Sequence, residues 1–154
     1  YGFKTKAGRL SIWTMALVLA LASFFSLYGT AQAAQLTSRK LTLGSSVPSA
    51  STTYAFSMVL PSVTVVKSAE AVICTTASGA CTTPSGFVNS SATLTGQPVN
   101  LGDASGWTVN SSTAGKLRLT KTGNVAAPTG TTTFSFSSVT NPSATNATFF
   151  ARIT

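Results

Sequence analysis

Apolar and polar side chains alternate with a period of two along most of the chain after residue 34. The clearest case is Tyr54, Phe56, Met58 and Leu60, which are separated by Ala, Ser and Val and followed by Pro61. This alternation is typical of a strand with one face in a core. Similar segments predict seven or eight strands, at residues 36–43, 54–60, 63–74, 87–94, 107–109, 116–121, 132–139 and 148–154.

Clusters of Gly, Ser, Asn and Pro separate these segments, and no helical period follows residue 34. Short strands joined by regular turns predict an all-β fold, an antiparallel immunoglobulin-like β-sandwich, with a barrel as the alternative. In a sandwich one face of each strand is buried. The alternation assigns the following side chains to the core: Phe56, Met58, Ile73, Leu94, Trp107, Val109, Leu117, Leu119, Phe134, Phe136, Phe149 and Ile153.

The first 33 residues have the composition of an export signal. Basic side chains precede an apolar run from Leu10 to Tyr28, and an Ala-Gln-Ala triplet follows at 31–33. We therefore predict a signal peptide over 1–33, cleaved before Ala34. The run is longer than the ~7–15 apolar residues of most signal peptides and approaches the ~20 that span a bilayer, so an uncleaved anchor helix is the alternative.

Either form of the leader places residues 34–154 outside the cytoplasm, as one domain. The chain of 154 residues has no initiating Met, and its last residues resemble an unfinished strand. We expect a fragment at both ends, with the β-domain truncated at its C-terminus.

Both cysteines lie in the stretch CTTASGAC, as Cys74 and Cys81. Their spacing is not the C-x-x-C of thiol exchange, and two cysteines alone cannot form a zinc site. An exported protein can keep them oxidised. The sequence predicts a structural disulfide that closes a turn at Ala77, Ser78 and Gly79, with Cys74 ending one strand and Cys81 beginning the next.

The residue types present exclude most kinds of catalytic site. The chain has no His, and Glu70 and Asp103 are its only carboxylates. A Ser-His-Asp or Cys-His site is therefore impossible. A glycosidase would need the two carboxylates to meet, and nothing local brings them together. A small hydrolase that uses Ser and Lys remains the weaker alternative.

Metal and nucleotide sites also lack support in the sequence. Asp103 stands alone in a Gly/Ser-rich turn, where we expect it to bond its own backbone rather than a cation. No Gly-rich phosphate-binding loop follows a predicted strand and opens a helix. We expect no metal and no cofactor.

The exported part is basic, and two of its cations share one face. Its seven Lys and Arg residues against two acids leave a net charge of about +5. Because Leu117 and Leu119 point inward, Lys116 and Arg118 must point outward together, as a candidate anion-contact face. Such a charge attracts polyanions such as wall polymers or lipid headgroups. The basic residues are scattered without interleaved aromatics, so no specific nucleic acid is expected.

Several stretches resemble a known family: QLTSRKLTLGSSVPSASTTYAFSMVLPS, CTTASGACTTPSGF, NLGDASGWTV and VTNPSATNATFFARIT. They are similar to secreted Ser/Thr-rich β-sandwich proteins of small-genome candidate-phylum bacteria of the Saccharibacteria type. The likeness covers nearly all of residues 35–154. It implies a cell-surface β-sandwich, a further segment after Thr154, and no assigned enzyme activity.

These observations predict a non-enzymatic protein, secreted or on the cell surface, that serves envelope structure or adhesion. Its expected partners are cell-envelope polymers or a host-cell surface, together with the membrane if the leader is retained. A subunit of a surface fibre is the second hypothesis. Such a subunit would keep the apolar helix or lend a strand to a neighbour at a sheet edge.

Overall fold

The computed structural model describes residues 36–61, 65–123, 126–145 and 147–154. The chain divides into two units after Ala33, and all described residues belong to the second, Ala34–Thr154. The predicted leader and its apolar helix lie outside the described residues. Within those residues there is no helix, and none could therefore cross a membrane.

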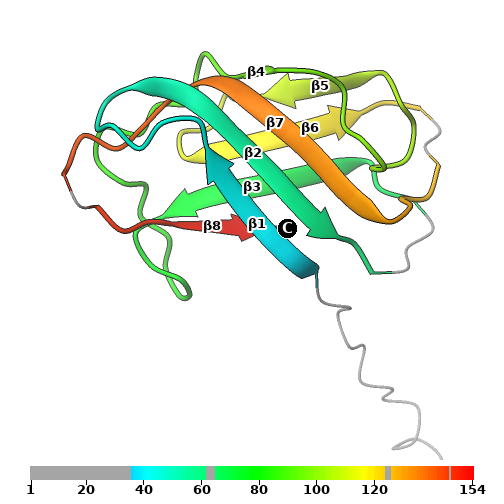
Figure 1. The fold of residues 1–154 in the computed structure, drawn as a ribbon, viewed down its shortest axis with the longest axis horizontal. Coiled ribbons are helices and arrows are strands. Elements are labelled where there is room, and N and C mark those ends of the chain that lie inside the picture. Colours follow the sequence, from blue (N-terminus) through cyan, green and yellow to red (C-terminus); the bar gives the residue numbers. More distant parts are fainter. Residues whose placement is uncertain (1–35, 62–64, 124–125, 146) are drawn as a thin grey trace, which may run out of the picture. The chain divides into compact units, whose positions relative to one another are not determined.

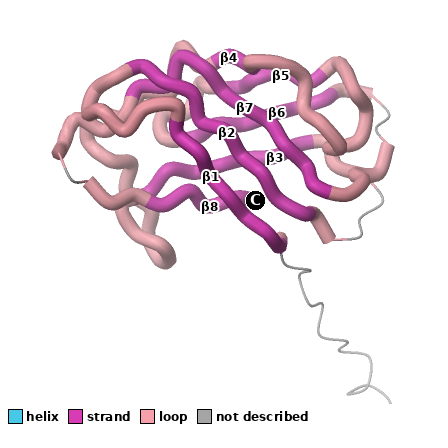
Figure 2. The backbone as a smooth tube through the Cα atoms, viewed as in Figure 1, coloured by secondary structure: helices cyan, strands magenta, loops and turns pink. Residues whose placement is uncertain are grey.

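Eight strands form two antiparallel sheets of four strands each, as Figure 1 and Figure 2 show. The first sheet has the order β1 (Thr37–Leu43), β2 (Ser51–Val59), β7 (Thr131–Thr140) and β4 (Thr93–Leu94). The second has the order β5 (Trp107–Asn110), β6 (Lys116–Lys121), β3 (Ser68–Cys74) and β8 (Phe150–Ile153). The prediction of an all-β, antiparallel fold is confirmed.

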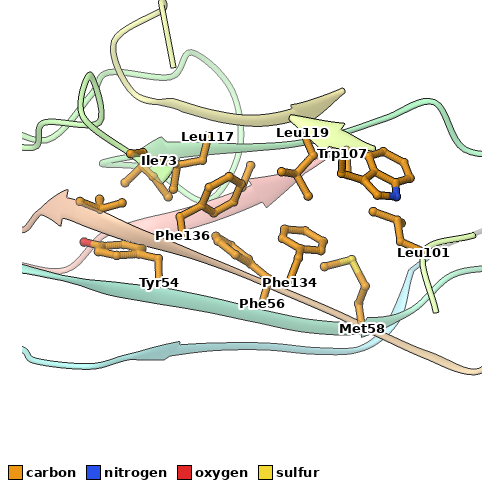
Figure 3. Close-up of a cluster of buried hydrophobic side chains, with 14 of the residues drawn as sticks. Tyr54, Phe56, Met58, Ile73, Leu101, Trp107, Leu117, Leu119, Phe134 and Phe136 are labelled. Atoms are coloured by element: carbon orange, nitrogen blue, oxygen red, sulfur yellow. The ribbon is translucent and has the colours of Figure 1, made fainter. Parts of the chain in front are cut away.

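The predicted alternation sends apolar side chains into the space between the two sheets (Figure 3). Tyr54, Phe56 and Met58 of β2 are buried, as are Leu117 and Leu119 of β6. Eight of the predicted core residues are buried: Phe56, Met58, Ile73, Trp107, Leu117, Leu119, Phe134 and Phe136. The other four, Leu94, Val109, Phe149 and Ile153, are only half-buried and pack against this core.

Three phenylalanines form the centre of the first sheet's inner face. Phe56 stands opposite Phe134 in the β2–β7 register, with ring centroids 5.3 Å apart. Phe136 meets both rings edge to face, with centroids 6.0 and 5.9 Å away. Edge-to-face aromatic pairs add about 0.5–1.5 kcal/mol beyond the area they bury. These contacts fix the register of β2 against β7.

The predicted strand at 87–94 is wrong over most of its length. Only Thr93–Leu94 forms a strand, with an isolated bridge at Val88. The chain turns at Asn89, whose buried side chain donates hydrogen bonds to the carbonyls of Thr113 (2.9 Å) and Lys116 (2.7 Å). If residues 87–94 formed a regular strand, the side-chain amide of Asn89 would point away from these two carbonyls. The hydrogen bonds of Asn89 therefore interrupt the strand at this residue.

The continuation of the cysteine loop also differs from the prediction. Cys74 does end β3, but Cys81 begins no strand. The cause is that β3 already pairs with β6 on one side and β8 on the other. The returning segment therefore makes one backbone bond, from Thr75 N to Thr82 O (2.9 Å), and leaves the sheet.

An irregularity marks the start of the edge strand β1. The register against β2 shifts between Thr37 and Lys40, and Ser38 has a positive φ of 50°. A bulge of this kind leaves a residue unpaired and twists the edge. Together with the exposed Arg39 and Lys40, it makes this edge a poor template for another strand.

We predict that Phe136→Ala lowers the free energy of unfolding by about 3–5 kcal/mol, because it removes a fully buried ring from the centre of the core. Phe150→Ala is the matched control, since Phe150 is 38% exposed. That change should cost less than about 1 kcal/mol. Urea denaturation followed by tryptophan fluorescence measures both, and equal losses would contradict the assignment of the core.

Candidate functional site

The predicted anion-contact residues lie beside an acid on the neighbouring strand. Glu70 of β3 stands opposite Arg118 of β6, and Lys116 is two positions away on the same face. Glu70 Oε1 lies 3.1 Å from Lys116 Nζ, while Oε2 accepts a hydrogen bond from Arg118 Nε and forms an ion pair with Arg118 Nη2. The three side chains together carry a net charge of +1. This face is thus partly neutralised within the protein.

The carboxylate of Glu70 is held ionised by these partners. Burial alone would raise the pKa of Glu70, but hydrogen bonds from Lys116 and Arg118, together with their charges, outweigh that effect. The pKa therefore lies below its ordinary value. The arrangement is suited to joining β3 to β6 rather than to accepting a proton at neutral pH.

The second acid, Asp103, joins two loops. Its Oδ2 lies 3.2 Å from Lys121 Nζ, and its Oδ1 accepts a bond from the Ala126 N–H at 3.1 Å. The expectation that Asp103 bonds the backbone of its own turn is wrong, because its side chain reaches a segment 23 residues away. The turn itself is closed by another bond, in which Trp107 Nε1 donates to the backbone carbonyl of Asp103 at 3.0 Å.

Two cations on β1 have no acidic partner, because the chain's only acids are the two already paired. Arg39 and Lys40 are exposed, and they line a groove of about 290 Å³ between β1 and β8. Its apolar lining includes Phe56, Phe149 and Ile153. Arg39 and Lys40 are therefore neighbouring exposed cations without an acid, whereas Lys116 and Arg118 share Glu70.

The two cysteines are joined as predicted: Cys74 and Cys81 form a disulfide. Cys74 is fully buried at the end of β3, whereas residues 75–80 are all exposed. Gly79 has a positive φ of 73°, which supplies the turn. Arg152 of β8 donates to the carbonyls of Thr76 and Gly79 in this loop.

Buried polar side chains serve the connections between strands. Asn141 donates to the carbonyls of Ser45 and Val47, both at 2.9 Å, and accepts from the Tyr54 hydroxyl at 2.9 Å. Burial raises the pKa of Tyr54 to about 12. Among the described residues no buried side-chain nitrogen or oxygen lacks a partner. A shallow pocket of about 310 Å³ beside Asn141 and Phe149 thus has its buried polar groups already bonded.

Sequence reasoning found the disulfide and the shared face of Lys116 and Arg118, but it missed their partner and the role of Arg152. The signal for the partner was present, since Glu70 is the one acid within a predicted strand. No comparable signal existed for Arg152, because its acceptors lie in a loop 73 and 76 residues earlier and are mostly backbone carbonyls.

We predict that Glu70→Gln lowers the free energy of unfolding by about 1–2 kcal/mol at neutral pH, because two cations lose a charged acceptor. A lowered folded-state pKa stabilises the protein above the unfolded-state pKa of about 4.3, and this contribution is lost as the pH falls through the folded-state pKa. Urea denaturation from about pH 3 to pH 7 should show the two proteins converging in acid.

Lys40→Gln is the control for this series, since Lys40 is an exposed cation without an acidic partner. Its effect should be small and the same at every pH. A Glu70→Gln difference that persisted unchanged to the lowest pH would show that the charge of Glu70 does not stabilise the fold.

Comparison of the chain with family models, curated proteins and solved structures finds no match. Within the described residues, no three His, Cys, Asp or Glu side chains gather where they could hold a metal ion. Inferences about function therefore depend on the ion pairs, the unpaired cations and the loop contacts described above.

Proposed function

We propose that the chain is an exported, non-enzymatic β-sandwich protein that contacts acidic polymers of the cell envelope or of a host-cell surface. The observation that carries this proposal is the distribution of charge. Glu70 and Asp103 bind Lys116, Arg118 and Lys121, while Arg39 and Lys40 on β1 face solvent without an acid. An acidic polymer would find its strongest attraction at β1.

The internal pairing of the acids supports a scaffold rather than a catalyst. Both carboxylates bond fixed cations, so neither is free to act as a general acid or base. The weaker alternative, a Ser/Lys hydrolase, needs a lysine amine bonded to a nucleophilic hydroxyl. Among the described residues Lys121 Nζ contacts Asp103 and the Ser105 carbonyl, and no lysine bonds a serine hydroxyl.

We further propose that the domain is immunoglobulin-like. In space, β1, β2, β7 and β4 take the positions of strands A, B, E and D, and β3 and β8 take those of C and F. The chain forms β4 before β5 and β6, so its connections after β3 differ from those of a variable-type domain. The proposed leader at 1–33, cleaved or retained as an anchor helix, would carry this domain out of the cytoplasm.

A subunit of a surface fibre is the second candidate, and the free edge of β8 favours it. Thr154 and Glu70 exchange both backbone hydrogen bonds, so the alternate residues Ala151 and Ile153 turn their backbone groups away from β3. No described residue fills the place of strand G beside β8. A strand of a second copy could pair there. Negative-stain images of expressing cells should then show filaments, and single particles would count against assembly.

The leading proposal predicts that the full chain, in mild detergent, binds fluorescent polyglycerol phosphate at low salt and releases it at high salt. Replacing Arg39 and Lys40 together with Ser should weaken the Kd about 30-fold, since each cation near an anionic surface contributes about 1 kcal/mol. Fluorescence anisotropy measures the Kd.

Two further double variants sharpen this experiment. Replacing Lys116 and Arg118 with Ser should change the Kd less, because both cations already form ion pairs with Glu70. Replacing Thr37 and Thr42 of β1 with Ala removes no charge and should leave the Kd unchanged. A larger loss at Lys116 and Arg118 would move the contact to the second sheet, and binding insensitive to both cation pairs would refute the proposal.

A further inference from the structure

The loop between the two cysteines has little besides the disulfide to hold its shape. Residues 75–80 are all exposed, so no apolar burial fixes them. Two hydrogen bonds lie inside the loop or at its neck: Thr76 Oγ1 donates to the Ala80 carbonyl (2.8 Å), and Thr75 N to Thr82 O (2.9 Å). Exposed bonds of this kind open easily on their own. The closed conformation therefore depends on the bond between Cys74 and Cys81.

This closed loop presents backbone oxygens to one side chain of the last strand. Arg152 Nη1 donates to Gly79 O at 2.7 Å, and Nη2 donates to Thr76 O at 2.8 Å and to Thr76 Oγ1 at 2.9 Å. Arg152 Nε adds a second bond to Thr76 O at 3.2 Å. A planar guanidinium can engage two acceptors at once only if they are held at the right separation. The oxidised loop sets that separation.

The strand that carries Arg152 has few other attachments. β8 is four residues long and, within the described residues, pairs only with β3. Phe150 is exposed, and Ala151 and Ile153 are only half-buried. Cys74 stands opposite Phe150, so the loop leaves β3 next to the point where β8 begins. Figure 1 shows the loop and β8 side by side at the same end of the sheet.

We propose that the Cys74–Cys81 disulfide controls the docking of β8, with Arg152 as the link between them. In the oxidised protein the loop holds the Thr76 and Gly79 carbonyls for the guanidinium, and β8 is fixed to β3. In the reduced protein the loop opens, Arg152 loses its acceptors, and β8 detaches more readily while the rest of the sandwich stays folded. The edge of the second sheet thereby becomes sensitive to redox state, whether or not the protein binds a polyanion.

The chemical step is ordinary thiol–disulfide exchange. A dithiol reductant attacks one sulfur of the Cys74–Cys81 bond, the other sulfur leaves as a thiolate, and a second attack returns two thiols and an oxidised reductant. Two electrons and two protons pass to the protein. Oxidation by a disulfide-bearing oxidant reverses the step and restores the loop.

Hydrogen exchange of the full chain in mild detergent, read by mass spectrometry, tests the proposal. Dithiothreitol should speed exchange over residues 149–154 about tenfold or more, since hydrogen bonds from a charged donor are lost. Exchange over β2 and β7 should stay unchanged. Reduction that speeds every strand equally would overturn the proposal, because the disulfide would then stabilise the whole fold rather than β8.

Variants of Arg152 separate the link from the disulfide itself. In oxidised Arg152→Ser, the backbone amides of residues 149–154 should exchange as fast as they do in the reduced wild-type protein. Reduction of this variant should then speed their exchange little further. Arg152→Lys should fall between, because an ammonium lacks the planar fork. Lys67→Ser removes an exposed cation that does not contact the cysteine loop and should match wild type. If reduction accelerates Arg152→Ser as much as wild type, the loop and β8 are independent and the proposal fails.

Discussion

The packing of two inner sheet faces against each other is the constraint on which the rest of the structure depends. Because strand side chains alternate with a period of two, a slip of one residue would turn Phe56 and its neighbours to solvent. The stacked and edge-to-face rings of Phe56, Phe134 and Phe136 hold the longest strand pair in register. The unpaired cations of β1 take their position from this register, because β1 pairs with β2.

Polar side chains organise the connections where the ladders stop. Asn89, Asn141 and Asp103 each bond backbone groups of a segment distant in sequence. Each takes the place of a main-chain partner that an irregular segment cannot supply. The protein has only two acids, and both are bonded within the fold: Asp103 to backbone and to Lys121, and Glu70 to Lys116 and Arg118.

The fold was predictable from sequence to the extent that it follows from alternation. The strand at 116–121 has the predicted bounds, because the alternation of Leu117 and Leu119 with charged residues leaves one possible orientation. The strand at 87–94 failed because local pattern cannot show that Asn89 will bond a hairpin more than twenty residues later. Leu101 lies outside every predicted strand, although it is 1% exposed, because a core side chain in a loop follows no period.

The candidate sites divide in the same way. The disulfide was predictable from the spacing of the cysteines together with the predicted export, and the outward pair Lys116 and Arg118 from strand geometry. Their neutralisation by Glu70 depends on which strand lies next to β6, and that is a property of topology. The contact from Arg152 to the loop depends on β8 pairing with β3, although β4, β5, β6 and β7 lie between them in the sequence. Non-local pairing of this kind leaves no trace in a single sequence.

The edge strands β1 and β8 differ in how they are protected against pairing with strands of other chains. The bulge at Ser38 and the exposed cations make the β1 edge irregular and mutually repulsive. β8 has no such bulge, its one cation, Arg152, is bonded to the cysteine loop, and it exposes Phe150. Of these two edges, β8 is therefore the one along which the strand of another chain would meet less steric and electrostatic resistance.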